Sequence, residues 1–263
     1  MKLLEIKAAG FGWFRHPPLF RIDELRLDEG AKILLIGQNG TGKSTLLRIL
    51  SGEETLTQGE MSLRPALRIT RFEQTAFFAG TVRDIFDELF QEAIEAEKAL
   101  RNMEIQMQEN ADERLLLEYE KLCDQFDGLG GYQYLIDRNT FIETFGLATK
   151  LDIPFCLLSG GEQQYVCLAK TIFAKCELML LDEPFSFLDH EKRKWLVAYL
   201  IKIKKPLSSF ATKKNTFVVS LLKQLKLQMA WLNSILVMLF TLKKKSRKQK
   251  FVSYGTIRIL KRS

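Results

Sequence analysis

Eight residues near the N-terminus have the types and spacing that bind a phosphate chain. The stretch from Gly37 to Ser44 reads GQNGTGKS and matches the pattern G-x-x-x-x-G-K-[ST]. Glycines let the main chain wrap round an anion, so that successive N–H groups and the start of the following helix point at it. Lys43 would reach the β- and γ-phosphates, and the Ser44 hydroxyl would complete the coordination of Mg²⁺. The predicted contacts of this glycine-rich loop are Gly37, Gln38, Asn39, Gly40, Thr41, Gly42, Lys43, Ser44 and Thr45.

Two neighbouring carboxylates form a second group with chemical potential. Asp182 and Glu183 directly follow four apolar residues at 178–181. A parallel strand that is buried on both faces delivers its polar residues at its carboxyl end, the edge at which open α/β sheets bind ligands. Asp182 is therefore placed to hold the hydration shell of Mg²⁺, and Glu183 to orient and deprotonate a water that attacks the γ-phosphate. A strand that simply ends in solvent explains one acid but not this combination.

A third group, LSGGEQQ at residues 158–164, opens a predicted helix that runs to residue 174. Ser159 can cap that helix, and Glu162 three residues later can accept a reciprocal hydrogen bond from Ser159. The N–H groups of Gly160 and Gly161 offer another anion site. Taken alone, this segment predicts only a well-capped helix.

Strands and helices of the required kinds surround these groups. The apolar run at 33–36 predicts a buried strand before the glycine-rich loop, and a helix is expected after the loop, ending at Gly52. From Thr81 the apolar spacing becomes helical, in a segment rich in Glu, Ala, Lys, Gln and Leu. The predicted strands lie at 3–9, 19–27 and 59–72 (one or two strands), and the predicted helices at 81–125 (a pair or one broken helix) and 134–145.

Three aromatic rings lie between the first two predicted strands, at residues 10–18. An exposed ring upstream of a phosphate loop can stack on a nucleotide base, and Phe11 or Phe14 is the favoured candidate. The alternative is that these rings pack on the sheet.

Composition favours a core-forming protein of a reducing compartment. The 263 residues, 46% of them apolar, suit one large domain or a domain with an inserted subdomain. The cysteines share no C-x-x-C spacing and have only two histidines to accompany them, so we expect reduced core residues rather than disulfides or metal ligands. The N-terminus alternates like a strand and lacks the apolar core of a signal peptide. The four cysteines are Cys123, Cys156, Cys167 and Cys176.

In chain order, these groups resemble the nucleotide-binding domain of the ATP-binding cassette (ABC) ATPases over about residues 1–200. The order is GQNGTGKS, Gln74, LSGGEQ, LLLDEP and then SFLD at 186–189, and the LSGGEQ segment is nearly private to that family. The resemblance implies an α/β fold with a P-loop NTPase core sheet, an N-terminal antiparallel β subdomain and an α-helical subdomain inserted at about 81–158. It implies ATP and Mg²⁺ as ligands.

Further site roles follow from the resemblance alone. Gln74 would be the lid glutamine that touches Mg²⁺ and the attacking water, beside Glu183 as the second catalytic residue. Ser159, Gly160 and Gly161 would grip the γ-phosphate of an ATP held by a facing domain. Asp189 would lie at the seam between the two domains.

The long acidic helical region and the Gly-Gly-Tyr sequence at 130–132 are similar to the ABC-F branch of this family. Members of that branch are soluble, usually carry two such domains in one chain, and act on the ribosome, some of them conferring antibiotic resistance. The separate ATPase subunit of a transporter is the alternative.

The sequence departs from the family pattern where a switch histidine is expected, at the end of a late strand. Residues 216–220 predict such a strand, but Leu221 and Leu222 follow it, and no histidine lies beyond His190. That histidine normally holds the attacking water and the γ-phosphate. Its absence predicts slow or no hydrolysis even where ATP binds.

The last part of the chain differs in charge from the rest. Residues 192–263 hold nineteen of the 39 Lys and Arg and none of the 32 Asp and Glu, so they carry +19 and the remainder −12. One interpretation is a normal domain end, with a helix near 222–231, a strand at 235–240 and a basic arm at 243–250 that contacts RNA phosphates. The other, which the lack of acids favours, is a reading frame lost after about Tyr199.

Together these observations predict ATP binding and hydrolysis by an ABC-type domain at 1–200, followed by an atypical segment at 201–263. The favoured function is a cytoplasmic ABC-F-like factor that acts on the ribosome or in antibiotic resistance. The alternatives are an ABC transporter subunit and a degenerate fragment that binds ATP without turnover. The expected partners are a second ABC domain and the ribosome or RNA, with a membrane partner only for the transporter alternative.

Overall fold

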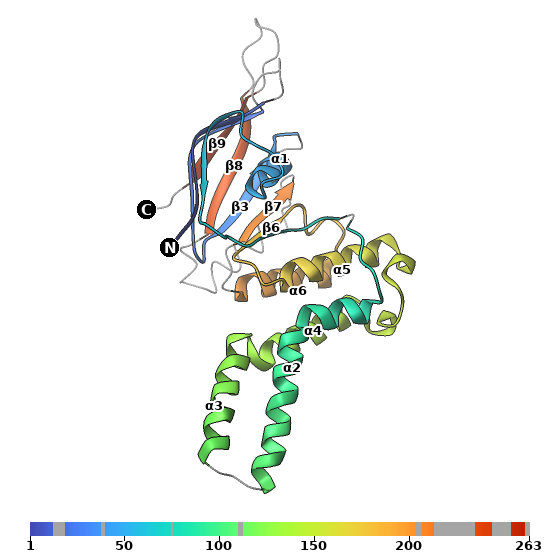
Figure 1. Ribbon diagram of the computed structural model, residues 1–263. Coiled ribbons are helices and arrows are strands. Elements are labelled where there is room, and N and C mark those ends of the chain that lie inside the picture. Colours follow the sequence, from blue (N-terminus) through green and yellow to red (C-terminus); the bar gives the residue numbers. More distant parts are fainter. Residues whose placement is uncertain are drawn as a thin grey trace, which may run out of the picture. The chain divides into compact units, whose positions relative to one another are not determined.

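The computed structural model describes residues 1–12, 19–37, 40–74, 76–109, 113–203, 207–212, 235–243 and 254–260. The chain divides into two compact units, and Figure 1 labels many of their elements. The first unit joins Met1–Glu73 to Ala174–Ser263, and the second is Gln74–Phe173. The second unit contains the predicted insertion at 81–158 and also takes in the helix that follows it.

Among the described residues, nine strands of the first unit form one sheet, in the order β4-β1-β2-β9-β8-β3-β7-β6-β5. β1 pairs antiparallel with β2 and with β4, whereas β3 is parallel to both β7 and β8. This confirms the predicted α/β class with an antiparallel N-terminal part. The strands are β1 (Lys2–Phe11), β2 (Phe20–Asp28), β3 (Lys32–Gly37), β4 (Gln58–Leu63), β5 (Ile69–Arg71), β6 (Leu178–Leu181), β7 (Leu207–Thr212), β8 (Ile235–Lys243) and β9 (Tyr254–Leu260).

The burial of the strands follows from their position in the sheet. β6 reads LMLL and all four residues are buried, as expected for a parallel strand covered on both faces. β2 alternates instead, with Ile22, Leu25 and Leu27 buried and charged residues exposed between them. β6, buried along its whole length, ends directly before the acid pair.

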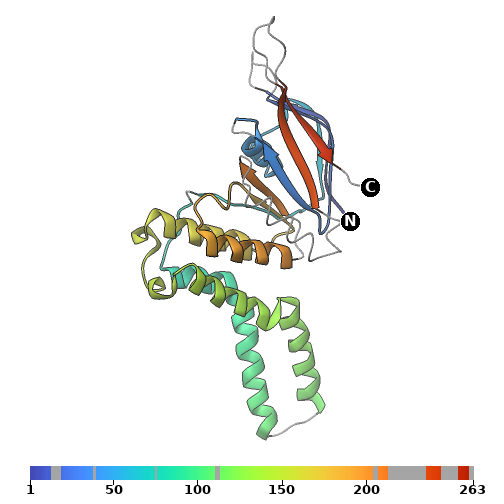
Figure 2. The ribbon, with the colours of Figure 1, turned by 180° about the vertical axis from the view of Figure 1, so that it is seen from behind.

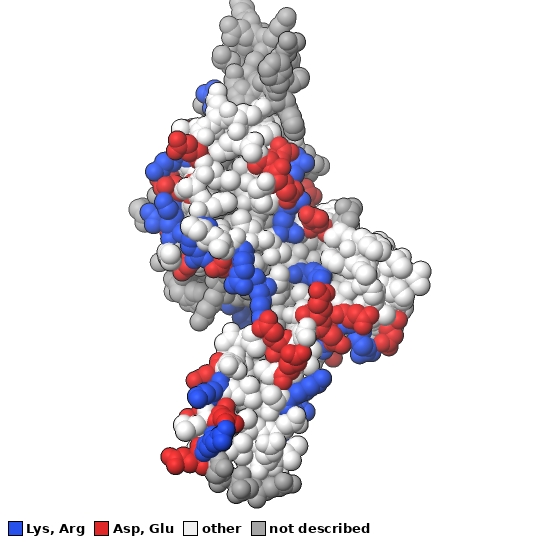
Figure 3. All heavy atoms as spheres, in the orientation of Figure 1, with Lys and Arg blue, Asp and Glu red and all other residues white. Residues whose placement is uncertain are grey.

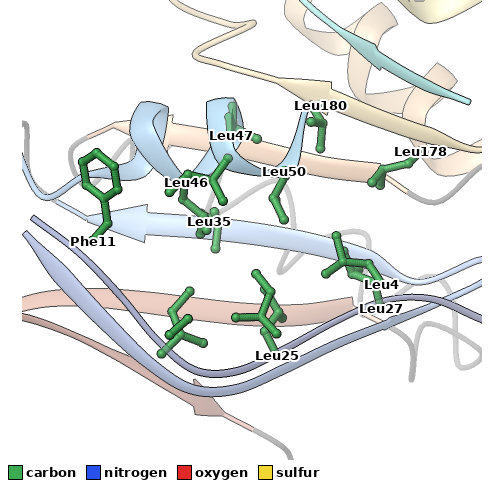
Figure 4. Close-up of a cluster of buried hydrophobic side chains, with 14 of the residues drawn as sticks. Leu4, Phe11, Leu25, Leu27, Leu35, Leu46, Leu47, Leu50, Leu178 and Leu180 are labelled. Carbon is green, nitrogen blue, oxygen red and sulfur yellow. The ribbon is translucent and has the colours of Figure 1, made fainter. Parts of the chain in front are cut away.

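The core of the first unit lies between helix α1 (Lys43–Leu50) and the sheet. Leu46, Leu47 and Leu50 of α1 meet Leu35 of β3 and leucines of β1, β2 and β6, as Figure 4 shows. Burying each such leucine is worth about 1.5–3 kcal/mol. In the two opposite views of Figures 1 and 2, α1 lies along β3. The core thus fixes the start of the helix that directly follows the glycine-rich loop.

Helix α6 (His190–Lys202) also belongs to the first unit. Asp189 caps it by accepting a hydrogen bond from the Lys192 N–H at 3.0 Å. Its buried positions include Leu196 and Leu200, and the rings of Trp195 and Tyr199 stack with centroids 5.1 Å apart.

The second unit is helical and is organised around aromatic side chains. Phe90 and Phe141 are both buried and both contact Phe173, and the Tyr134 hydroxyl donates to the Phe173 carbonyl at 2.7 Å. The predicted pair of helices from Thr81 is present as two separate helices. The helices are α2 (Val82–Glu109), α3 (Glu113–Gly128), α4 (Gly131–Thr144), η1 (Ala148–Lys150), η2 (Phe155–Leu157) and α5 (Gly160–Phe173).

Helices α2 and α3 present mostly polar surfaces. Acidic and basic side chains are interspersed over this hairpin in Figure 3, and Tyr119 of α3 donates to Glu104 of α2 at 3.0 Å. Within the described part of the chain, each helix is too short or too polar to cross a membrane.

Of the four predicted core cysteines, two are buried, Cys123 is partly buried and one is exposed. All four cysteines are free thiols, and Cys167 and Cys176 are buried. Cys156 is exposed beside Leu157, which is itself 72% exposed, so it is not a core residue. It lies in a short 3₁₀ turn, where sequence periodicity does not separate inside from outside.

Three segments of the basic C-terminal part, β7, β8 and β9, belong to the described sheet. β8 contains the strand predicted at 235–240. The strand predicted at 216–220, the helix near 222–231 and all of the basic arm beyond Lys243 lie outside the described residues.

Candidate functional site

The glycine-rich loop has the backbone conformation that a close anion cradle needs. Gly40 and Gly42 have φ values of 77° and 91°, in the left-handed region that favours glycine. A Cβ at Gly42 would lie 2.7 Å from a Phe20 ring carbon and 2.9 Å from Leu19, so any other residue would have to displace these side chains and adopt a strained φ. Gly37 ends β3, while Gln38 and Asn39 lie outside the described residues.

Gly42 is also the N-cap of α1, and among the described residues no side chain caps this helix end by a hydrogen bond. The first N–H groups of a helix have no partner within the helix, and its dipole favours an anion there. An N-terminus that keeps a glycine in place of a capping side chain suits an external anion such as phosphate.

Lys43 is almost completely buried, with 4% of its surface exposed, and its Nζ donates to the Thr41 hydroxyl at 3.4 Å. Burial lowers the pKa of Lys43 below its ordinary value, because it disfavours the charged ammonium. The charges of Glu183 and then Asp182 oppose this effect and raise the pKa. Lys43 is therefore within electrostatic reach of both acids of the pair. The structure brings together the loop and the acids that the sequence separates by about 140 residues.

Asp182 follows β6 directly, and its Oδ1 atom is buried without a hydrogen-bond partner among the described residues. An unpartnered buried carboxylate oxygen is costly, so it suits a cation that would complete its contacts. Hard oxygen ligands of this kind are what Mg²⁺ prefers. The residues that would hold the ion in this unit are Asp182 and Ser44, the latter at the start of α1.

Glu183 occupies a strained turn at the end of the same strand. Its φ is 48°, and its carbonyl accepts hydrogen bonds from both the N–H and the hydroxyl of Ser186. Sequence reasoning singled out Glu183 but missed Ser186 and Arg193, which donates to the Phe185 carbonyl. The available signal was Pro184, which favours the second position of a turn that ends at Ser186.

The LSGGEQ segment belongs to the second unit, where it opens α5. The Glu162 carboxylate accepts hydrogen bonds from the Ser159 N–H and hydroxyl, both at 2.8 Å, and the Glu162 N–H donates back at 3.4 Å. This reciprocal pair is the predicted capping box. Gly160 and Gly161 are exposed, with open space where a Cβ would stand. Their contact with phosphate stays a prediction, and so does the contact of Gln74, which is exposed at the start of this unit.

Three predicted site residues remain to be placed, namely Thr45, Asp189 and Phe14. Thr45 lies in the first turn of α1 and is buried. Asp189 caps α6 and forms an ion pair with Lys192, whose hydrogen bond to the carboxylate lowers the pKa of Asp189. Its predicted place at a domain seam stays a prediction. Phe14 lies outside the described residues.

The prediction that Phe11 stacks on a base needs correction. Phe11 is 4% exposed, belongs to the core and stacks on Phe20 with ring centroids 6.1 Å apart. β1 continues two residues beyond its predicted end, which puts Phe11 on the same face as buried Ala9. A ring enclosed in this way has no free face for a nucleotide, so the sheet-packing alternative describes it.

The fold and this arrangement of loop and acids correspond to a known class of nucleotide-binding proteins. A family model described as ABC transporter matches residues 20–186. The chain therefore belongs to the ABC transporter family, and its curated matches include members of the F branch. ATPase domains of this family bind ATP, usually with Mg²⁺, and work as dimers or with partners.

Among particular relatives, the tylosin resistance ATP-binding protein TlrC of Streptomyces fradiae is 36% identical over 183 residues, which cover 67% of this chain and 33% of TlrC. The energy-dependent translational throttle protein EttA of Escherichia coli K12 is 33% identical over 178 residues, or 65% of this chain and 31% of EttA. The chain thus spans about a third of the length of these relatives.

A solved structure titled RNase-L Inhibitor has a similar fold. Its TM-score is 0.62 at 18% identity, with 97% of this chain and 39% of that chain covered. At this identity the likeness concerns the fold alone.

Proposed function

We propose that this chain binds ATP with Mg²⁺ and hydrolyses it in a site completed by a second ABC domain. We further propose that it is a cytoplasmic ABC-F-like factor that acts on the ribosome or in antibiotic resistance. The observation that carries the proposal is the burial of Lys43 beside the glycine cradle, within electrostatic reach of Asp182 and Glu183.

Each of these groups has a role that its surroundings support. The glycine-rich loop and the start of α1 would bind the phosphates, and Lys43 would neutralise charge on the β- and γ-phosphates. Asp182 and Ser44 would hold Mg²⁺, which stabilises negative charge on the phosphate oxygens when bound. Glu183 would accept the proton of the attacking water, as a carboxylate at the carboxyl end of β6 can.

The proposed second ABC domain would supply phosphate contacts that the glycine-rich loop does not provide. The resemblance to ABC domains predicts that Ser159, Gly160 and Gly161, around the start of α5, would grip a phosphate held by a facing copy or partner chain. The test is Glu183→Gln under saturating ATP, with oligomeric state measured by analytical ultracentrifugation. Removing the base should trap ATP and give nucleotide-dependent dimers. A variant that binds ATP but remains monomeric would count against a composite site.

The proposed role on the ribosome or in antibiotic resistance is supported by the names of two relatives, one a translational throttle protein and one a tylosin resistance protein. Sedimentation of the full chain with ribosomes and with membranes, with and without ATP, tests this role. Salt-dependent, ATP-dependent recovery with ribosomes is the expected result. Recovery with membranes would instead favour a transporter subunit.

A second candidate is an ATP-dependent clamp that does not turn over. It is favoured by the sequence beyond His190, which contains no histidine to serve as the family's switch residue. Phosphate release measured beside binding of a fluorescent ATP analogue separates the two candidates. Binding with phosphate release at the rate of the Glu183→Gln variant would favour the clamp.

A further inference from the structure

The turn that carries Glu183 contains backbone strain. The φ of Glu183 is 48°, in the left-handed region where a Cβ approaches the backbone too closely. Such a conformation persists only when surrounding contacts hold it, and it is concentrated at functional sites. The contacts that hold Glu183 are therefore informative about its function.

Ser186 supplies two of these contacts to a single acceptor. Its N–H donates to the Glu183 carbonyl at 3.1 Å and its hydroxyl donates to the same oxygen at 2.9 Å. Pro184 between them has its φ restricted by its ring, as the second position of a turn requires. The N–H bond is common to turns of this type, so the hydroxyl is the additional feature.

Helix α6 supports the same turn from outside. Arg193 donates from Nε to the Phe185 carbonyl at 3.1 Å, and the Phe185 side chain is buried, with 5% exposed. The Leu188 N–H donates to the same carbonyl at 3.4 Å. The Glu183–Pro184 and Phe185–Ser186 peptide units of the turn are thus both hydrogen bonded.

We propose that Ser186, supported by Arg193, is a positioning residue that keeps Glu183 in its left-handed conformation with the carboxylate directed at the phosphate side of the sheet. A return to negative φ would rotate Cβ about the N–Cα bond while β6 stays fixed, and would redirect the carboxylate. The proposal rests on the proposed function, because it assigns the carboxylate its role as the base. Ser186 itself touches neither water nor phosphate in this role.

The kinetic test uses the full chain with Ser186→Ala, Ser186→Thr and Arg193→Met, and with Lys194→Met as the control on the next, exposed residue of α6. Ser186→Ala should slow phosphate release by up to about tenfold, because one hydrogen bond of the turn is lost. Affinity for a fluorescent ATP analogue should stay within about twofold, since the phosphate cradle is unchanged. Arg193→Met should slow release less, while Ser186→Thr should restore it and Lys194→Met leave it unchanged.

The same substitution in the Glu183→Gln background separates positioning from general damage. If Ser186 acts through Glu183, Ser186→Ala should cause no further loss of phosphate release there. An equal loss in both backgrounds would overturn the proposal. A fall in analogue affinity as large as the fall in turnover would do so too.

A stability measurement tests the strain at Glu183 even if the chain binds ATP without turnover. Glycine normally destabilises ordered backbone, but at positive φ it relieves strain. Glu183→Gly should therefore melt at a higher temperature than Glu183→Gln, which removes the same charge and keeps the Cβ. A lower melting temperature for the glycine variant would contradict the strained turn. Failure to bind the ATP analogue would count against the proposed function and leave this melting comparison valid.

Discussion

The two helices that begin at candidate phosphate ligands, α1 and α5, differ in how their N-termini are capped. α1 begins after Gly42, which has no side chain and a left-handed backbone, and within the described part of the chain no side-chain hydrogen bond caps the helix start. α5 begins after Ser159, whose N–H and hydroxyl both donate to the carboxylate of Glu162. The N-terminus of α1 is thus open to an external anion, whereas at α5 the Glu162 carboxylate already accepts the hydrogen bonds of Ser159.

The difference shows that a helix dipole does not by itself make a phosphate site. Both N-termini have the same partial positive charge, but only α1 has a buried lysine beside it. At α5 a phosphate would compete with Glu162 for the donors of Ser159. We therefore expect phosphate to bind at the start of α1 without a change in the helix start, and at the start of α5 only if the Ser159–Glu162 cap rearranges.

The largest effect is expected for Lys43→Ala. Charge-assisted hydrogen bonds contribute about 1.5–3 kcal/mol each, so affinity for a fluorescent ATP analogue should fall by roughly 100-fold or more. The fold should survive, because burial already disfavours the Lys43 ammonium. Lys194→Ala, on the exposed side of α6, is the control. Unchanged analogue binding by Lys43→Ala would show that the phosphates are bound elsewhere.

Glycine-to-alanine substitutions compare the two helix starts directly. Gly42→Ala must tolerate a φ of 91° and a contact of 2.7 Å with Phe20. We expect a loss of about 2 kcal/mol in the free energy of unfolding, with weaker nucleotide binding. Gly160→Ala meets no atom within 4 Å and should be neutral or stabilise by up to about 1 kcal/mol. Denaturant unfolding curves measure both, and equal effects would remove the contrast.

Ser159→Ala tests whether α5 depends on its own cap. Loss of a serine N-cap costs about 1 kcal/mol, so the helical unit should open more easily, as seen by hydrogen exchange of the α5 amides. Ser159→Thr retains the hydroxyl and should retain most of the protection. Unchanged exchange in the alanine variant would mean that Glu162 satisfies the helix start without the serine.

The smallest expected effect is the pH dependence of the stability that the Ser159–Glu162 cap of α5 contributes. Hydrogen bonds from Ser159, followed by the charge of Lys150, lower the pKa of Glu162. Because the pKa in the folded state lies below that in the unfolded state, this carboxylate stabilises the fold above the unfolded pKa. The contribution is lost as pH falls through the folded value. The stability difference between the native chain and Glu162→Gln should therefore shrink below about pH 4, measured by thermal unfolding across pH.

Local patterns predicted most of the elements that form the site. The strand, glycine-rich loop and helix around Lys43 are contiguous in sequence, and the capping box at Ser159 requires residues only three positions apart. Such features are fixed by short-range geometry. The sequence also identified Asp182 and Glu183, since an apolar run followed by acids marks the end of a buried strand.

Features that depend on tertiary contacts escaped prediction. Whether Phe11 is exposed depends on where β1 ends and on the ring of Phe20, and neither follows from a strand pattern. The left-handed φ of Glu183 depends on a hydroxyl three residues away and on a helix that follows. Charge composition in the C-terminal part did not reveal which strands β7 and β8 would pair with.

That pairing has a consequence for how the protein matures during synthesis. β3, which ends at the glycine-rich loop, is hydrogen bonded on one side to β7 and on the other to β8. A growing polypeptide that has passed residue 189 contains every motif of the site, yet the strand before the cradle still lacks both neighbours. Nucleotide binding should therefore arise only once residue 243 has left the ribosome, so the earliest motif to be translated becomes usable among the last.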